Sequence, residues 1–258
     1  MNGDDGAVQS VSRTFALLER MIDVGGEAGV SDLANQLGLA LPTIHRLMRT
    51  LTSLGYVRQL PTRRYAVGPA LARLGQQAAQ LLGEWSRPSL IRLEAAVGET
   101  ANLAMLDADM VAYIGQVPSR HQMRMFTEVG RRVHAHSTGV GKAILSVLDD
   151  QQVRQLIEQT GMPKYTDRTI VDLASLQREL GVVRTRGYAI DEGEQELGVR
   201  CLAMAVPGAV TPTAVSVSGP SSRIAAEPEE RIVEALRAAA EDLSSVLGGG
   251  QRNFPGTA

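Results

Sequence analysis

The segment from residue 30 to residue 67 constrains the fold most, because two helical patterns separated by a tight turn are followed there by two strand patterns. Gly38 follows the first helical pattern, where a helix C-terminus favours a residue that tolerates positive φ. Pro42 begins the second, where its missing N–H group costs nothing. Strand patterns at 56–60 and 65–67 then enclose a turn. This order of elements predicts a winged helix-turn-helix domain.

The second helical pattern has an apolar face and a basic face. Apolar residues recur at helical spacing at Ile44, Leu47, Met48, Leu51 and Leu54. The segment holds five arginines and, after Asp32, no acidic residue. A basic helix face alone is often only a solvated surface, but a cationic hairpin directly after it favours binding to double-stranded DNA. The candidate DNA contacts are Arg13, Pro42, Thr43, His45, Arg46, Arg49, Arg63 and Arg64.

A helical pattern at 8–24 precedes this segment. Its apolar residues at spacings of four, three and four are Val11, Phe15, Leu18 and Ile22. We expect this stripe to pack against the core of the winged domain, at Leu33, Leu37, Ile44 and Leu47.

Length and composition indicate two domains. The chain has 258 residues, of which 44% are hydrophobic, whereas a typical single domain has about 100 to 150 residues. A single cysteine excludes an internal disulfide framework and, with no apolar run long enough for a membrane span, favours a cytoplasmic protein. The expected divisions are a disordered lead at 1–7, the DNA-binding domain at 8–68, a linker helix at 69–83, a second domain at 84–249 and a tail at 250–258.

The second domain alternates blocks of strands and blocks of helices, which indicates an α+β fold with helices around one antiparallel sheet. Before it, the linker helix is expected to be interrupted at Gly83, with another helix at 87–97. Strand patterns occur at 101–106, 110–117, 123–126, 188–191, 200–206 and 212–219. Helical patterns occur at 139–148, 150–160, 172–186 and 226–247.

A glycine-rich turn at 137–143 opens one of these helices, with Thr138 as the expected cap. Unpaired N–H groups at Gly139, Val140 and Gly141 would attract a small carboxylate through the helix dipole. The turn lacks the spacing of a Walker loop, so we expect no nucleotide triphosphate and no cofactor.

Polar residues on the later strands could complete a site for a small oxo- or hydroxy-acid. Ser216 and Ser218 alternate with valines, which places both hydroxyls on one face of a strand, while Asp191 ends one strand and Cys201 begins another. The same residues also have ordinary structural uses: Asp191 as a turn cap, Cys201 as a buried apolar residue and the serines as partners of neighbouring strands.

Taken together, the chain resembles the IclR (isocitrate-lyase-regulator) family of bacterial transcription factors over nearly its whole length. The resemblance rests on seven motifs in order, around residues 8–13, 42–47, 98–103, 136–143, 186–189, 192–201 and 216–220. It implies an N-terminal winged reader, a linker helix, a C-terminal GAF-like effector domain, and dimers or tetramers on a palindromic operator. The resemblance to a glyoxylate-responsive repressor of this family implies effector contacts at Gly139, Val140, Asp191, Cys201, Ser216 and Ser218. The implied function is a regulator, more readily a repressor than an activator, and not an enzyme.

Three other hypotheses follow from the same residues. His134 and His136, with Cys201 and the Asp191-Glu192 pair, could hold a metal, but no paired ligand motif is present and we expect none. Cys201 could be the nucleophile of a GAF-like enzyme, which would need an adjacent base or a second cysteine. It could also be a redox sensor in a DNA-binding protein, in which case oxidation would replace the effector as the signal.

Overall fold

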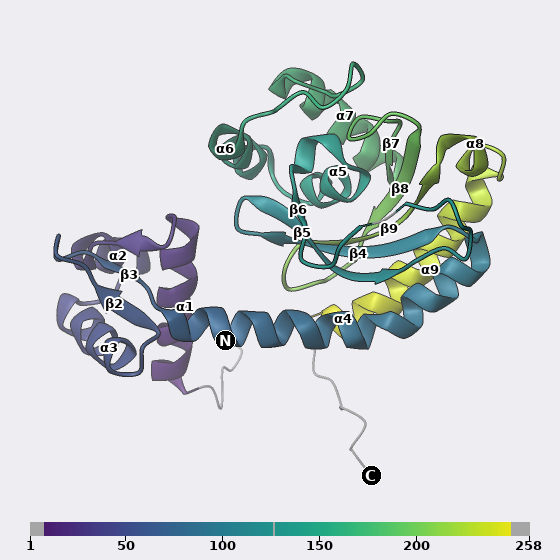
Figure 1. Ribbon diagram of the computed structural model, residues 1–258. Coiled ribbons are helices and arrows are strands. Elements are labelled where there is room, and N and C mark those ends of the chain that lie inside the picture. Colours follow the sequence, from purple (N-terminus) through teal and green to yellow (C-terminus); the bar gives the residue numbers. More distant parts are fainter. Residues whose placement is uncertain (1–7, 126, 249–258) are drawn as a thin grey trace, which may run out of the picture. The chain divides into compact units, whose positions relative to one another are not determined.

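The computed structural model describes residues 8–125 and 127–248 and divides into two compact units, Met1–Ala78 and Ala79–Ala258 (Figure 1). The expected lead at 1–7 and tail at 250–258 lie outside the described residues. The first unit is a helical domain with a small sheet and the second is an α+β domain, as expected.

The first unit is a winged helix-turn-helix domain. Its helices are α1 (Gln9–Asp23), α2 (Val30–Leu37) and α3 (Leu41–Ser53), and its strands are β1 (Glu27–Ala28), β2 (Val57–Gln59) and β3 (Tyr65–Val67). Gly38 ends α2 with φ +62°, as its position predicted. The strands pair in the order β1-β3-β2, and β1 is an element that the sequence analysis missed because it has only two residues. The wing therefore has three strands.

The face of α1 that packs on the core differs from the expected one. Leu17, Leu18 and Met21 are buried against α2 and α3, whereas Val11 and Phe15 are 51% and 59% exposed. Ile22, also in the expected stripe, is 54% exposed. The prediction was therefore right for Leu18 and wrong for Val11, Phe15 and Ile22, because two apolar stripes overlap on α1 and periodicity alone does not show which one faces the core.

The second unit is built on a six-stranded antiparallel sheet in the order β6-β5-β4-β9-β8-β7. Its strands are β4 (Thr100–Asp107), β5 (Met110–Val117), β6 (Arg132–Val133), β7 (Ala189–Asp191), β8 (Val199–Ala205) and β9 (Thr213–Pro220). Its helices are α4 (Pro69–Val97, which begins in the first unit), η1 (Ala135–Ser137), α5 (Gly139–Ser146), α6 (Asp150–Thr160), α7 (Leu173–Arg186), α8 (Ser221–Ile224) and α9 (Glu229–Leu247).

Helices cover both faces of this sheet, giving two separate apolar cores (Figure 1). On one face, α5, α6 and α7 pack on residues such as Ala104 and Ala203. On the other, α4 and α9 pack on Leu103 and Leu202. Neighbouring positions on one strand thus belong to opposite cores, as the two-residue period of a strand requires.

The strand expected at 123–126 was wrong for residues 123–125, which are irregular, and Phe126 lies outside the described residues. The edge position next to β5 is taken by β6, which pairs Val133 with Val111. Alternating apolar residues without a partner strand do not form a strand, because the backbone hydrogen bonds come from pairing.

The interruption expected at Gly83 was also wrong, since α4 is one helix from Pro69 to Val97, with Pro88 inside it. A Cβ atom on Gly83 would lie 2.4 Å from the carbonyl oxygen of Ile114 on β5. Glycine is therefore required here for a close approach of helix and strand, and it does not end the helix.

Two glycines of α4 give a matched test. We expect Gly75→Ala to raise the free energy of unfolding by about 0.5 to 1 kcal/mol, because alanine favours the helix and a Cβ there meets open space. Gly83→Ala should lower it despite the same gain in propensity, because the new methyl group collides with the backbone of Ile114. Urea unfolding of the two variants is the measurement, and stabilisation by both would contradict the close approach.

Candidate functional site

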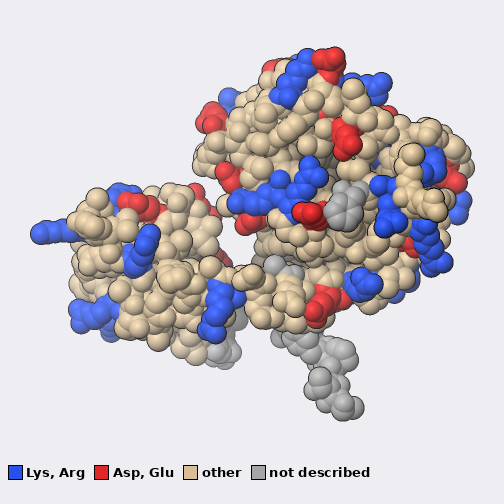
Figure 2. Space-filling view, in the orientation of Figure 1, with Lys and Arg blue, Asp and Glu red and all other residues tan. Residues whose placement is uncertain are grey.

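The first unit presents a polar face of α3 to solvent. Ile44, Met48 and Leu51 anchor the helix in the core, which leaves the opposite side uncovered. The expected DNA contacts on that side are Pro42, His45, Arg46 and Arg49, which are exposed, and Thr43, which is half-buried. Figure 2 shows arginine side chains, in blue, projecting from this unit with few acidic ones beside them. Arg13, on α1, is half-buried.

The two arginines at the wing tip have different surroundings. Arg63 is exposed, has φ +64° and makes no ion pair among the described residues. The guanidinium of Arg64 donates from Nε to Glu27 Oε1 at 2.8 Å and from Nη2 to the Glu27 carbonyl oxygen at 3.1 Å. Arg64 therefore ties the turn between β2 and β3 to β1, whereas Arg63 is a cation at the tip with no ion pair among the described residues.

In the second unit, a band of polar side chains crosses the sheet on the face that α5 covers. The strand register places Asn102 opposite Ser216, Ser218 opposite Cys201, and Cys201 opposite Asp191. The polar band consists of Asn102, Gln116, Asp191, Cys201, Ser216 and Ser218; all but the half-buried Gln116 are buried. Strand pairing thus brings together the expected site residues of β7, β8 and β9.

Asn102 and Gln116 were missed from the sequence. The Asn102 amide nitrogen donates to Ser216 Oγ at 3.5 Å and Ser218 Oγ at 3.4 Å, and Gln116 Nε2 donates to Asn102 Oδ1 at 3.1 Å. The signal that could have found Asn102 is an amide between the apolar Ala101 and Leu103 of a strand, because a buried amide needs partners.

The N-terminus of α5 lies over this band. Thr138 caps the helix as expected, since its Oγ1 accepts from the Gly141 N–H at 3.1 Å. The N–H groups of Gly139 and Val140 have no partner among the described residues. A Cβ atom on Gly139 would lie 2.8 Å from Cys201 Sγ, so the helix end touches the band. Two N–H donors therefore face a sheet carrying hydroxyl groups, the arrangement that binds anions.

Asp191 is buried and holds the loop that follows β7. Its Oδ1 accepts from the Glu194 N–H at 2.6 Å. Burial raises the pKa of this carboxyl to about 6, while hydrogen bonds from backbone N–H groups and the charge of Lys142 act in the opposite direction. Asp191 thus caps a turn and lies in the polar band at the same time.

Lys142, on α5, is a charged residue that the sequence analysis did not include in the site. Its side chain is 1% exposed and forms ion pairs with Glu194, and with Glu179 of α7 at 3.5 Å. Burial raises the pKa of Glu194 to about 7, and the positive charge of Lys142 counteracts that rise. Because Lys142 is already paired, it joins α5 to the loop and to α7, and the unpaired groups at the α5 N-terminus are the N–H donors of Gly139 and Val140.

Cys201 is a neutral thiol in this environment. Burial, and then the negative charge of Asp191, raise the pKa of Cys201 to about 11. The thiolate is the reactive species, so a thiol of this pKa is a poor nucleophile at neutral pH. The surroundings of Cys201 thus argue against the enzyme and the redox sensor.

The histidine pair lies beside this site. His134 Nδ1 is 2.5 Å from the Tyr165 hydroxyl, and His136 Nε2 is 3.1 Å from the Pro163 carbonyl oxygen. Burial lowers the pKa of His136. Within residues 8–125 and 127–248, no cluster of three or more His, Cys, Asp or Glu side chains could hold a metal ion.

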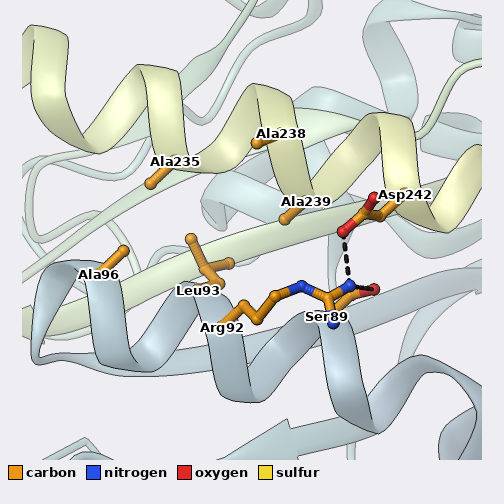
Figure 3. Close-up of a pocket in the computed structure, with 8 residues that line it drawn as sticks. All are labelled: Ser89, Arg92, Leu93, Ala96, Ala235, Ala238, Ala239 and Asp242. Carbon is orange, nitrogen blue, oxygen red and sulfur yellow. Dashed lines mark hydrogen bonds and ion pairs between the residues drawn. The ribbon is translucent and has the colours of Figure 1, made fainter.

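A separate cavity lies between α4 and α9 (Figure 3). It has a volume of about 190 Å³, and four of the eight residues that line it are alanines. The ion pair of Arg92 and Asp242, at 2.6 Å, lies across it. It is on the sheet face opposite the polar band and contains none of the expected site residues.

Comparison with known proteins identifies both units. The IclR helix-turn-helix domain matches residues 10–61, and the C-terminal domain of the bacterial transcriptional regulator IclR matches residues 79–245. The chain belongs to the IclR family. As an IclR-family protein it is a DNA-binding transcriptional regulator with a C-terminal effector domain, which decides between the regulator and the enzyme considered above.

Individual relatives agree with this assignment. The transcriptional repressor IclR of Escherichia coli K12 is 36% identical over 95% of this IclR-family chain and 92% of its own length. The repressor AllR of the same strain is 33% identical over 93% and 90%. The crystal structure of Thermotoga maritima IclR, 26% identical, matches 94% of this chain and 100% of its own with a TM-score of 0.61. Among the described residues, no helix has the length and apolar character needed to cross a membrane.

The buried carboxyl of Asp191 predicts a pH dependence of stability. The folded state raises its pKa from 3.8 to about 6, so its stabilising effect is present below pH 4 and is lost as the pH rises through 6. Asp191→Asn keeps an acceptor for the Glu194 N–H but cannot titrate. We expect it to remove a dependence of the free energy of unfolding on pH that approaches about 1.4 kcal/mol per pH unit in this range. Urea unfolding at pH 4 to 7.5 is the measurement.

Asp191→Ala is the matched control. It removes the charge and also the acceptor, so it should flatten the same slope while lowering the free energy of unfolding at every pH. An unchanged slope in both variants would show that Asp191 is not the group responsible.

Proposed function

We propose that this regulator is a repressor that works in the cytoplasm, binds a palindromic operator as a dimer or tetramer, and changes its operator affinity when a small organic acid binds in the second unit. In this proposal, residues 8–68 bind DNA, residues 69–83 form the linker helix between the two domains, and residues 84–249 bind the effector. The relatives named repressors support the sign of regulation. The observation that carries the effector site is the α5 N-terminus facing the polar band.

The operator contacts follow from exposure and charge. His45, Arg46 and Arg49 are exposed on one side of α3, which suits the edges of bases in a major groove. Arg63, at the wing tip, is placed for phosphates. Because Arg64 is paired with Glu27, we assign it a smaller share of the phosphate contacts.

Self-association is supported by α1. Val11, Phe15 and Ile22 form an exposed apolar stripe on that helix, which is unusual on the surface of a small domain that remains monomeric. One recognition helix also contacts few base pairs, and a second copy related by a two-fold axis doubles that number.

The effector class follows from the donors of the site. The N–H groups of Gly139 and Val140 are suited to a carboxylate, and the hydroxyls of Ser216 and Ser218, with the Cys201 thiol, to a second oxygen. A small 2-oxo or 2-hydroxy acid has both. Asp191 lies at the β7 end of this site, where its carboxylate is held by the backbone N–H of Glu194.

Substitutions of the arginines test the DNA-binding surface. We expect Arg46→Ala and Arg49→Ala to lose about 1 to 3 kcal/mol of discrimination between operator and random DNA. Arg63→Asn, which tolerates positive φ, should weaken binding to all sequences and reduce the slope of log affinity against log salt by about 1. Arg64→Ala should change that slope less.

Binding at several salt concentrations, with a footprint of the operator, measures these effects. The footprint should cover two half-sites about one helical turn apart, or a multiple of it. Variants that bind like the unchanged protein at every salt concentration would show that another surface contacts DNA.

A panel of acids tests the effector site. Glyoxylate, pyruvate and other oxo-acids, with aromatic acids for comparison, are added to the full chain and the melting temperature is followed, since a ligand of the native state raises it. Ser218→Ala should weaken binding by about fivefold, the cost of one hydrogen bond of about 1 kcal/mol, and leave operator binding intact. Equal binding by Ser218→Ala and the unchanged protein would place the effector elsewhere.

A further inference from the structure

The side chain of Asn102 connects three strands at the centre of the polar band. It is fully buried on β4, with Gln116 on the neighbouring β5 and both serines on β9 at its other side. Each of its polar atoms has a partner, because Oδ1 accepts from Gln116 and the two protons of Nδ2 reach Ser216 and Ser218. In this arrangement the Asn102 amide directs its nitrogen at the serines and its oxygen at Gln116.

That orientation fixes what the serines can offer. Each hydroxyl oxygen accepts a hydrogen bond from Asn102, so its own proton remains available to another acceptor. The carboxylate of Asp191 is an acceptor in the same band, but backbone N–H groups of the loop after β7 already donate to it. Together with the N–H groups of Gly139 and Val140, the groups left for a ligand are therefore donors, which require acceptor atoms.

A β-bulge on β5 brings Gln116 into this network. The register between β4 and β5 shifts at Leu103 and Ala104, so Leu103 is opposite Gly115 and Ala104 is opposite Tyr113. Ile114 packs on the α4 side, and a Cβ on Gly115 would point to Leu90 and Ser86 of α4, 3.2 Å away. Ile114 and Gly115 thus both face α4, and the next residue, Gln116, lies on the same face of the sheet as Asn102.

We propose that Gln116 and Asn102 are positioning residues that set the hydrogen-bonding polarity of the effector site, and so select acids with an acceptor oxygen beside the carboxylate over the corresponding amino acids. The inference rests on the proposed function. An oxo oxygen accepts from Ser216 and Ser218, whereas an ammonium group brings more donors to a place that already has them.

Gln116→Glu is the decisive variant, because Gln116 is half-buried and the change is isosteric. A carboxylate at this position cannot donate to Asn102 Oδ1, so the Asn102 amide turns to donate to that carboxylate and directs its own oxygen at the serines. The serine protons are then used by Asn102. We expect calorimetry at pH 7.5 to show pyruvate and glyoxylate binding weakened by about tenfold or more, the cost of two hydrogen bonds.

Gln116→Met is the matched control, since it removes the donor without imposing an acceptor, and its loss should be smaller. At pH 5 the introduced carboxyl group, once protonated, regains a proton to donate. At pH 5, the affinity of Gln116→Glu for the acids should therefore come closer to that of the unchanged protein at the same pH. The affinity of Gln116→Met should show no such recovery. Comparison at equal pH cancels the titration of Asp191, Cys201, Tyr113 and Glu194, which all variants share. A defect of packing alone would show no such recovery.

The outcomes test the role of Gln116 and Asn102 separately from the proposed effector class. If the unchanged protein binds pyruvate or glyoxylate and Gln116→Glu binds them equally well, the polarity role is wrong and the effector site stands. Equal losses in Gln116→Glu and Gln116→Met at both pH values would also overturn it. If the unchanged protein binds none of the acids, the proposed effector class fails, and this inference fails with it. Retained operator binding shows that each variant is folded.

Discussion

The buried ion pair between Lys142 and Glu194 is the interaction on which the effector unit depends. A lysine with 1% exposure needs an opposite charge, and Glu194 supplies it from the loop after β7. Glu194 also donates its backbone N–H to Asp191, so the ion pair fixes the loop and the loop fixes the carboxylate. Because Lys142 lies on α5, this pairing also holds the N-terminus of that helix over the polar band.

The sheet of the second unit separates two environments. The face toward α4 and α9 is apolar throughout its centre, and glycines at Gly83 and Gly115 allow the helix to approach it closely. The face toward α5 carries hydroxyl, amide, thiol and carboxyl groups in a row. A strand with a two-residue period can serve both faces at once, and a β-bulge changes which residues reach each face.

In the first unit, the capacity to bind phosphates depends on which arginines already have an acidic partner as well as on how many arginines there are. Arg64 is held by Glu27, while Arg63, its neighbour in sequence, has no ion pair among the described residues. Phosphate binding releases counterions only where a cation is not already neutralised within the protein. The exposed stripe on α1 likewise shows that apolar residues at helical spacing need not face the core of their own domain.

The sequence by itself determined the helix-turn-helix with its wing and most of the order of elements, because capping, periodicity and turn chemistry are local properties. It also predicted Gly139, Cys201, Ser216 and Ser218 as site residues, and the fold brings these four close together. Only the tertiary structure decided which stripe of α1 is buried, that Gly83 serves a close contact, and that β6 takes the sheet edge. It also decided the roles of Asn102, Gln116 and Lys142. The partners of Asn102 and Gln116 lie 14 to 116 residues away along the chain, and Glu194 lies 52 residues from Lys142. Local sequence patterns do not show which residues so far apart will pair.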